Sequence, residues 1–216
     1  MTKRGPQSRT QTQRRAQTRQ RIVDAAIELH STIGPARTSY SAVARRAGVT
    51  RPTVYAYFPD KPSLFAACSG HVMATDPPPG LAGWPDLADP IERLRTGLTG
   101  MYAYYRRHAA RIANLERDMP LMQMTMPPGR TIEGDRGRLA ETLATDLSSP
   151  GQASELIVAA VRHALAFSTW RSLTQPRGAS DEEAVALMVG VVEDARRRAS
   201  ARGKARAPRA VPGRSN

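Results

Sequence analysis

Cysteine is almost absent from this sequence, and long apolar runs are missing altogether. Cys68 is the single cysteine among 216 residues, so no disulfide can form within the chain. The first residues are basic and polar, without the apolar core of a secretory signal. No stretch approaches the ~18 uninterrupted apolar residues of a membrane span. We therefore expect a cytoplasmic protein with no membrane partner.

Motifs for metal binding and catalysis are missing as well. The four histidines, at positions 30, 71, 108 and 163, make no H-x-x-x-H pair and no Cys/His cluster, so no metal site is predicted. No Ser-His-Asp order, glycine-rich phosphate loop or carboxylate pair points to an active site. The sequence therefore predicts neither an enzyme nor a cofactor. Cys68 follows the apolar run Leu64–Ala67 and is predicted to be a core residue rather than a redox sensor.

Acidic residues are scarce at both ends of the chain. The formal net charge is +13, with +9 in residues 1–65, −4 in residues 66–195 and +8 in residues 196–216. Basic ends on a mildly acidic body suit a polyanionic partner. A solvated charge run is the alternative, and it explains the C-terminal residues better than the N-terminal ones.

The most informative segment runs from Thr38 to Leu64 and predicts two short helices around a tight turn, then the start of a third. Its first helix has an apolar face and ends at Gly48, because glycine readily adopts the left-handed conformation past a last turn. Thr50 can cap the next helix, and Pro52 fits its first turn. This pattern predicts a helix-turn-helix whose second helix enters a DNA major groove.

The second helix offers several hydrogen-bond donors to DNA. Arg51 and Thr53 lie in its first turn, where side chains reach base edges. Tyr55 and Lys61 are placed for phosphate contacts, and Asp60 is a candidate N-cap for the third helix. A capped helical corner with no role in DNA binding is the alternative. The candidate DNA-binding residues are Thr38, Ser39, Thr50, Arg51, Pro52, Thr53, Tyr55, Tyr57 and Lys61.

Residues Thr18 to Leu64 resemble the DNA-binding domain of TetR-family transcriptional regulators. The matching residues are Arg19, Ile22, Ala25, Ala26, Leu29, Gly34, Thr38, Val43, Ala44, Ala47, Gly48, Val49, Thr50, Thr53, Tyr55, Tyr57, Phe58, Lys61 and Leu64. Three positions depart from the family pattern. His30 replaces an aromatic or aliphatic residue, Pro35 replaces an aromatic one, and Tyr40 replaces a small aliphatic one, and these changes bear on how the first helix packs. The resemblance implies a homodimer that binds an operator in double-stranded DNA.

No strand-like alternation is visible, so the predicted fold class is all-α. We expect an N-terminal three-helix helix-turn-helix domain, followed by a helical bundle for ligand binding and dimerisation. The predicted divisions are a disordered basic arm (1–17), the DNA-binding domain (18–74), the second domain (75–198) and a disordered basic tail (199–216). Helices are expected from Thr18 to Ser31, from Asp60 to Ala74, from Ile91 to Asp118 and from Thr131 to Leu147. The proline-rich stretch from Thr75 to Pro90 is predicted to be a loop or hinge.

Two strongly apolar helices close the chain. One is predicted over residues 153–174, and the other follows a capping box formed by Ser180 and Glu183. A terminal helix that is apolar on nearly all sides needs cover beyond one neighbour. We expect these last two helices to form a homodimer as a four-helix bundle, with an intramolecular core as the alternative.

Between the proline-rich loop and the terminal helices, the sequence predicts a ligand chamber. Methionines adapt to irregular apolar shapes, and tyrosines add a polar tip. For each of these residues a plain core position is the competing interpretation, also for His163. The candidate ligand-binding residues are Met101, Tyr102, Tyr105, Met119, Met122, His163 and Phe167, with Met124, Met126 and Trp170 as further members.

Two functional hypotheses follow. The first is a dimeric repressor that a small-molecule effector releases from its operator. The second is a DNA-binding dimer without such an effector, switched by a protein or purely architectural.

Overall fold

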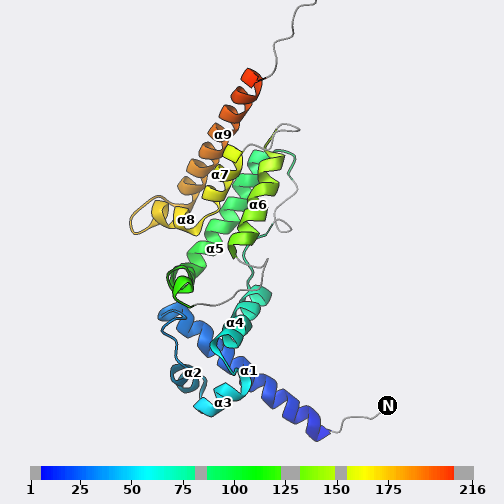
Figure 1. The fold of residues 1–216 in the computed structure, drawn as a ribbon, viewed down its shortest axis with the longest axis vertical. Coiled ribbons are helices and arrows are strands. Elements are labelled where there is room, and N and C mark those ends of the chain that lie inside the picture. The colour runs from blue at the N-terminus through cyan, green and yellow to red at the C-terminus, as the bar shows by residue number, and fades with distance from the viewer. Residues whose placement is uncertain (1–5, 81–86, 123–131, 149–154, 207–216) are drawn as a thin grey trace, which may run out of the picture. The chain divides into compact units, whose positions relative to one another are not determined.

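The computed structural model describes residues 6–80, 87–122, 132–148 and 155–206, and their secondary structure is entirely helical, without a strand (Figure 1). The all-α fold class predicted from the sequence is thereby confirmed. The α-helices, given in chain order, are α1 (Pro6–Thr32), α2 (Tyr40–Ala47), α3 (Arg51–Tyr57), α4 (Lys61–Thr75), α5 (Pro90–Asp118), α6 (Ile132–Asp146), α7 (Glu155–Ala164), α8 (Phe167–Thr174) and α9 (Asp181–Arg206). A 3₁₀ turn, Met119–Leu121, follows α5.

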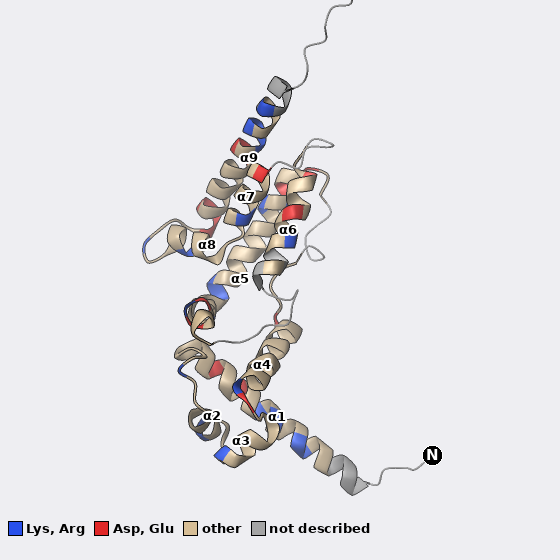
Figure 2. Cartoon of the chain, in the orientation of Figure 1, with Lys and Arg blue, Asp and Glu red and all other residues tan. Residues whose placement is uncertain are grey.

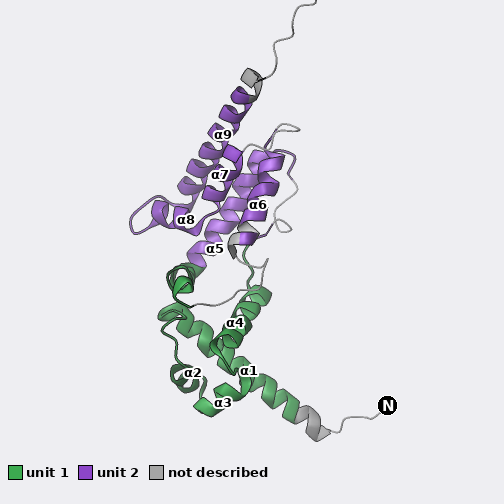
Figure 3. Cartoon of the chain, in the orientation of Figure 1, with its two compact units in different colours: residues 1–78, 108–125 green, residues 79–107, 126–216 purple. Residues whose placement is uncertain are grey.

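The chain forms two compact units, coloured separately in Figure 3. Unit 1 comprises residues 1–78 and 108–125, and unit 2 comprises residues 79–107 and 126–216. The boundary within α5 falls at His108, whose backbone angles (φ −115°, ψ 16°) depart from a helix and produce a kink. Unit 1 therefore contains the end of α5 in addition to α1–α4. A single division after residue 74, as in the predicted domain limits, does not anticipate this second segment.

The core of unit 1 lies between α1, α2, α3 and α4. The apolar face of α1 supplies residues at three- and four-residue steps, as a buried helical face requires. Fully or nearly buried members are Ile22, Val23, Ala26, Val43, Ala44, Val54, Phe58, Leu64 and Cys68. Cys68 is 3% exposed, and burial is the main cause that raises the pKa of its thiol to about 12. The expectation that Cys68 is a core residue is confirmed.

Both chain ends are more helical than predicted. The first helix begins at Pro6 instead of Thr18, so residues 6–17 are helical in place of the expected disordered arm. Pro6 suits a first turn, and the glutamine and arginine residues that follow extend a helix at little cost once the packed part has nucleated it. At the other end, α9 continues to Arg206, past the predicted tail start at residue 199.

Unit 2 packs the first part of α5 with α6, α7, α8 and α9. Its largest fully buried side chains include Trp170, Tyr102, Phe167, Leu143 and Ile157. Trp170 also donates from its indole nitrogen to Asp181, which opens α9. Ser180 and Glu183 form the capping box expected from the sequence: Ser180 N donates to the Glu183 carboxylate at 2.8 Å, and Glu183 N donates to Ser180 Oγ at 3.1 Å.

The predicted helix over residues 153–174 is divided in two. Helix α7 ends at Ala164 and α8 begins at Phe167. The hydroxyls of Tyr102 and Tyr105 donate to the carbonyls of Ala164 and Leu165, at 2.9 and 2.6 Å. These bonds satisfy carbonyls that the break leaves without a helical partner, so two side chains about 60 residues away in sequence stabilise the interruption.

Candidate nucleic-acid interface

The turn between α2 and α3 is defined by local caps. Gly48 ends α2 in the left-handed region at φ 65°, as predicted. Thr50 caps α3, with its hydroxyl accepting from Thr53 N at 3.3 Å, and Pro52 lies in the first turn. Asp60 caps α4 by accepting from Ser63 N at 2.7 Å, and this bond holds the pKa of Asp60 below its usual value. These caps fix where each short helix begins.

Helix α3 has one buried face and one exposed face. Val54 is fully buried and Phe58, at its C-cap, is 2% exposed, so both anchor the helix to the core of unit 1 as predicted. Arg51 and Pro52 are exposed, and Tyr55 is 43% exposed. Thr53 and Tyr57 are half-buried. Arginine residues lie along α1, α2 and α3 in unit 1 (Figure 2).

Tyr40 supports the exposed face of α3, a role that sequence reasoning missed. Its ring packs against Tyr55 with centroids 4.6 Å apart, and its hydroxyl donates to the Phe58 carbonyl at 3.0 Å. Burial is the main cause that raises the pKa of Tyr40 to about 12, so the hydroxyl stays protonated. On the other side, Arg51 lies over the Tyr55 ring and donates to its hydroxyl at 3.1 Å. The departure from the family pattern at position 40 therefore provides a platform for Tyr55.

A cleft of about 370 Å³ lies between the starts of α2, α3 and α4. Its lining residues are Ser39, Tyr40, Ser41, Arg51, Tyr55, Asp60 and Lys61. Arg51, at the start of α3, and Lys61, at the start of α4, supply positive charge, and the serines and Tyr55 add hydroxyl groups. The Asp60 carboxylate in this cleft is already hydrogen-bonded to the start of α4. Two cations and several hydroxyl donors around one concavity suit contact with a phosphate oxygen.

Two of the predicted DNA-binding residues have local structural roles. Ser39 is exposed and caps α2 by accepting from Ala42 N at 3.2 Å. Thr38 is 4% exposed, and its hydroxyl donates to the Gly34 carbonyl at 2.8 Å. The expectation that Thr38 offers its side chain to DNA is therefore corrected. Its hydroxyl is used inside the turn between α1 and α2.

The predicted ligand-binding residues of unit 2 lie mostly in its core. Met101, Tyr102, Tyr105 and Phe167 are at most 4% exposed. The ring of Tyr105 meets that of Phe167 edge-on at 5.4 Å, and Phe167 in turn packs on Trp170 at the same distance. Burial raises the pKa of Tyr102. The structure thus brings these aromatic residues together as one packed cluster, with both tyrosine hydroxyls bonded to backbone carbonyls.

The remaining candidates lie elsewhere. Met119 lies in the 3₁₀ turn that follows α5 and Met122 directly after that turn, both half-buried and in unit 1, and Met124 and Met126 fall outside the described residues. His163 is exposed on α7, with its Nδ1 3.3 Å from the Thr169 hydroxyl. The expectation that it points into a chamber is corrected, because its position on α7 faces away from the buried side formed by Ile157, Val161 and Ala164.

The described residues hold neither a candidate metal site nor a candidate membrane-spanning helix. Within these residues, no group of three or more histidine, cysteine, aspartate or glutamate side chains is placed to hold a metal ion. Among their helices, none combines the length and apolar character needed to span a bilayer.

Comparisons with known proteins agree with this geometry. The family model described as bacterial regulatory proteins, tetR family, matches residues 22–68. Over 50 residues the chain is 46% identical to the HTH-type transcriptional regulator AcrR of Shigella flexneri, a match that spans 23% of each protein.

Solved structures extend the likeness beyond the helix-turn-helix. A TetR-like transcriptional regulator from Rhodococcus sp. RHA1 is similar with a TM-score of 0.59 and 28% identity, over 88% of this chain and 96% of that one. A tetR-family transcriptional regulator from Streptomyces coelicolor shares the fold, with a TM-score of 0.53 and 22% identity over 90% of this chain and 91% of that one. The likeness therefore includes the helices that follow α4.

Proposed function

Because the chain belongs to the TetR family of bacterial regulatory proteins, we propose that it is a dimeric repressor that a small-molecule effector releases from its operator. The observation that carries the proposal is the capped α3 helix, with Arg51 and Tyr55 exposed beside Lys61 at the start of α4. A short helix held by buried residues on one face and presenting donors on the other is suited to a major groove.

The predicted DNA-binding residues have separate roles in this proposal. Arg51 and Thr53, in the first turn of α3, read base edges. Tyr55, Tyr57 and Lys61 contact phosphates and orient the helix. The remaining sequence-predicted positions, Ser39, Thr50 and Pro52, act through the local backbone, because they define where α2 and α3 begin.

Selection from a pool of random-sequence DNA duplexes tests the proposal. A dimer with two-fold symmetry should enrich a palindromic site whose half-sites are about 34–36 Å apart, or a multiple of that spacing. A protein that enriches no common sequence at moderate salt would contradict the proposal. Sites without symmetry would favour a monomeric DNA-binding protein.

An exposed apolar stripe on α9 supports the proposed dimer. Leu187 is 52% exposed and Val191 is 39% exposed, with the small Gly190 between them. Burying large apolar side chains of this kind against a second copy is the main driving force of such interfaces. Leu187→Arg should weaken dimerisation by roughly 10-fold or more in sedimentation equilibrium. Ser200→Arg, an exposed position on the same helix, is the matched control and should leave the dimer unchanged.

The runner-up function is a DNA-binding dimer that has no small-molecule effector. The packed cluster of Tyr105, Phe167 and Trp170 favours a DNA-binding dimer without an effector, because a ligand would have to separate these rings. A thermal-shift screen with apolar and cationic small molecules distinguishes the two. A ligand at 100 times its dissociation constant stabilises the native state by about 2.7 kcal/mol. If a broad screen yields no compound that stabilises the protein, this result would favour the runner-up function.

A further inference from the structure

The end of α5 caps the end of α1. Asn114 Nδ2 donates to the carbonyls of His30 and Ser31, at 3.1 and 2.8 Å, and Arg117 Nη2 donates to the carbonyl of Ile33 at 3.1 Å. Carbonyls in the last turn of a helix find no N–H partner within that helix, so their hydrogen bonds must come from donors elsewhere. Here the donors come from a segment more than 80 residues later in the chain.

Asp118 holds the turn that follows α1. Its Oδ2 accepts from the backbone N of Ala36 at 3.1 Å, and its Oδ1 accepts from Arg117 Nε at 2.6 Å. Arg117 Nη1 in turn donates to Asn114 Oδ1 at 2.9 Å, so the three side chains form one connected network. Asp118 is only 1% exposed, whereas the side chain of Arg117 is 45% exposed, so the carboxylate is held inside the turn and the guanidinium covers it from the surface.

Gly34 allows the close approach of the two segments. Its φ of +91° lies in the region that favours glycine. A Cβ at this position would also overlap Asp118 Oδ2 and Arg117 Nη2. The turn is therefore shaped in two ways to receive the end of α5. Thr38 closes the same turn by donating to the Gly34 carbonyl, directly before the N-cap of α2 at Ser39.

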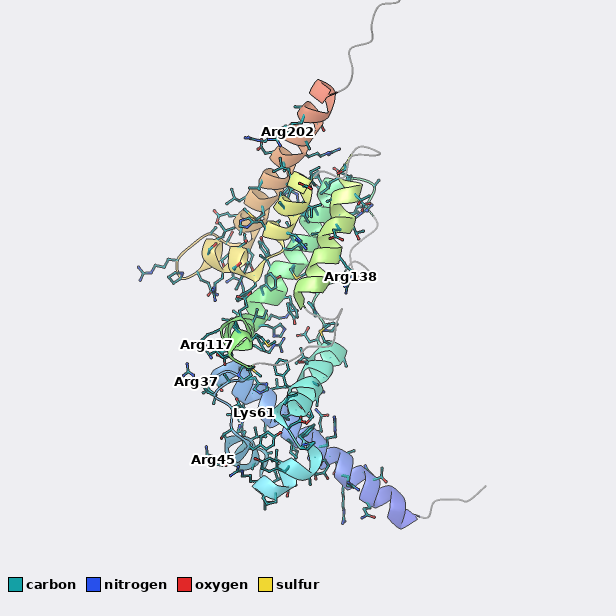
Figure 4. All side chains as sticks on the ribbon, in the orientation of Figure 1. Arg37, Arg45, Lys61, Arg117, Arg138 and Arg202 are labelled. Carbon is teal, nitrogen blue, oxygen red and sulfur yellow. The ribbon has the colours of Figure 1, made fainter. Side chains whose placement is uncertain are left out.

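This contact belongs to unit 1 although α5 begins in unit 2. The helix bends at His108, and the residues beyond the bend group with α1–α4 (Figure 3). Figure 4 labels Arg117 and Arg37 beside the end of α1, whereas Arg45 lies further along, on α2. The first part of α5 thus belongs to unit 2 and its second part to unit 1. Its last turn holds the segment that leads into α2 and α3.

We propose that Asn114, Arg117 and Asp118 form an α5 latch, a set of positioning residues that set the orientation of α3 and hence the affinity for DNA. The inference rests on the proposed DNA-binding function and extends it to residues outside the cleft at α3. The latch holds the α1–α2 turn, the turn leads directly into α2, and α2 packs against α3. A change in the path of α5 alters operator affinity through this contact.

The test compares acid-to-amide changes two residues apart on the full-length chain. Asp118→Asn removes the charge that pairs with Arg117, whereas Glu116→Gln changes an exposed residue of the same turn. The probe is a duplex that wild-type protein enriches from a random pool. We expect Asp118→Asn to weaken binding by roughly 3- to 30-fold and Glu116→Gln to have no effect beyond about 2-fold. The slope of log affinity against log salt should not change, because no phosphate contact is lost.

Hydrogen exchange gives a second readout that needs no DNA. The backbone N–H of Ala36, which donates to Asp118, should exchange faster in Asp118→Asn than in Glu116→Gln. Arg117→Lys is a milder variant that keeps the charge but loses the fork that bonds Asp118, Asn114 and Ile33 together. It should show the same direction of change if Asp118→Asn does not fold.

The outcomes separate the latch from the proposed function. Wild-type protein that enriches no DNA would overturn the DNA-binding function, and the latch with it. Wild-type protein that binds DNA, together with folded Asp118→Asn and Arg117→Lys variants of unchanged affinity, would overturn the latch alone. A lowered salt slope in these variants would also overturn it, because it would make the residues phosphate contacts.

Discussion

At the scale of single residues, the environment of α3 follows from short-range chemistry. Thr50, Pro52 and Asp60 occupy the cap and first-turn positions predicted from their types, because caps depend on neighbours within three residues. Thr38 is the exception, since its hydroxyl satisfies the Gly34 carbonyl inside the turn. Nothing in the sequence around Thr38 distinguishes a buried hydroxyl from one that faces DNA.

Arg51→Ala should reduce the preference for particular bases. The Arg51 side chain is exposed in the first turn of α3 and lies over the Tyr55 ring, so it is held in position before DNA is bound. Losing a bidentate contact to a base costs about 1–3 kcal/mol on the preferred site. Repeating the selection from random duplexes with the variant measures this effect. Arg177→Ala, an exposed arginine of unit 2, is the control, and an identical selected sequence for Arg51→Ala would contradict a base-reading role.

Lys61→Ala should weaken binding to selected and random DNA by equal factors. A phosphate contact carries little sequence information, and Lys61 lines the cleft beside Arg51 at the start of α4. The magnitude of the slope of log affinity against log salt should fall by roughly 1. Lys61→Arg keeps the charge and should retain the slope. If Lys61→Ala also kept the wild-type slope, Lys61 would not contact phosphate.

His30 should make the protein less stable as pH falls from 6.5 towards 4. Burial is the main cause that lowers the pKa of His30 from 6.5 to about 4, against the opposing effect of Asp118. The unfolded state therefore binds a proton in this window that the folded state does not, and the free energy of unfolding falls. The whole of this pKa shift corresponds to roughly 3 kcal/mol in the free energy of unfolding. Urea titrations at pH 7.5 and 5 should show a smaller difference for His30→Phe than for the wild type.

At the scale of secondary-structure elements, a tertiary contact overrides the periodicity of residues 153–174. This stretch has the apolar pattern of one long helix, yet it is divided at Leu165 and Ala166. The carbonyls at the break accept from tyrosines on α5, so the interruption costs few hydrogen bonds. The same two tyrosines were predicted to line a ligand chamber, and that role stays a prediction.

Tyr102→Phe should destabilise unit 2. Tyr102 is 0% exposed, and its hydroxyl donates to the Ala164 carbonyl. The variant keeps the ring in the core but leaves this carbonyl without its donor. The loss of a buried hydrogen bond of this kind costs about 1–3 kcal/mol, measurable by chemical denaturation. Tyr57→Phe, the same change at a half-buried position of α3, is the control and should shift stability by less than about 0.5 kcal/mol. Equal stability of Tyr102→Phe and wild type would show that the bond to Ala164 contributes nothing.

At the scale of the whole molecule, two units share one helix. Helix α5 begins in unit 2, bends at His108 and ends in the latch against α1. An effector that binds unit 2 and favours one path of α5 would change operator affinity by its differential affinity for the two states.

Operator and effector should therefore weaken each other by the same factor. Coupling free energies of about 1–3 kcal/mol correspond to a 5- to 150-fold change in affinity, and linkage makes the change reciprocal. Isothermal titration of a ligand found by thermal shift, with and without saturating operator duplex, measures the factor. A double variant with Arg51→Ala and Lys61→Ala is the control, since operator should not affect its ligand affinity. If the ligand affinity of the wild-type protein is the same with and without operator, this result would favour the effector-free function.

The sequence by itself determined the all-α class, the helix-turn-helix with its caps and the capping box at Ser180, because each depends on residues within one or two turns of chain. Only the tertiary structure decided the division of residues 153–174, the platform that Tyr40 provides for Tyr55 and the α5 latch. Asn114 and Asp118 lie in an ordinary polar helix end, and nothing local reveals that they satisfy backbone groups some 80 residues earlier. Contacts of that range depend on how the helices pack, and periodicity within one helix carries no information about its partner.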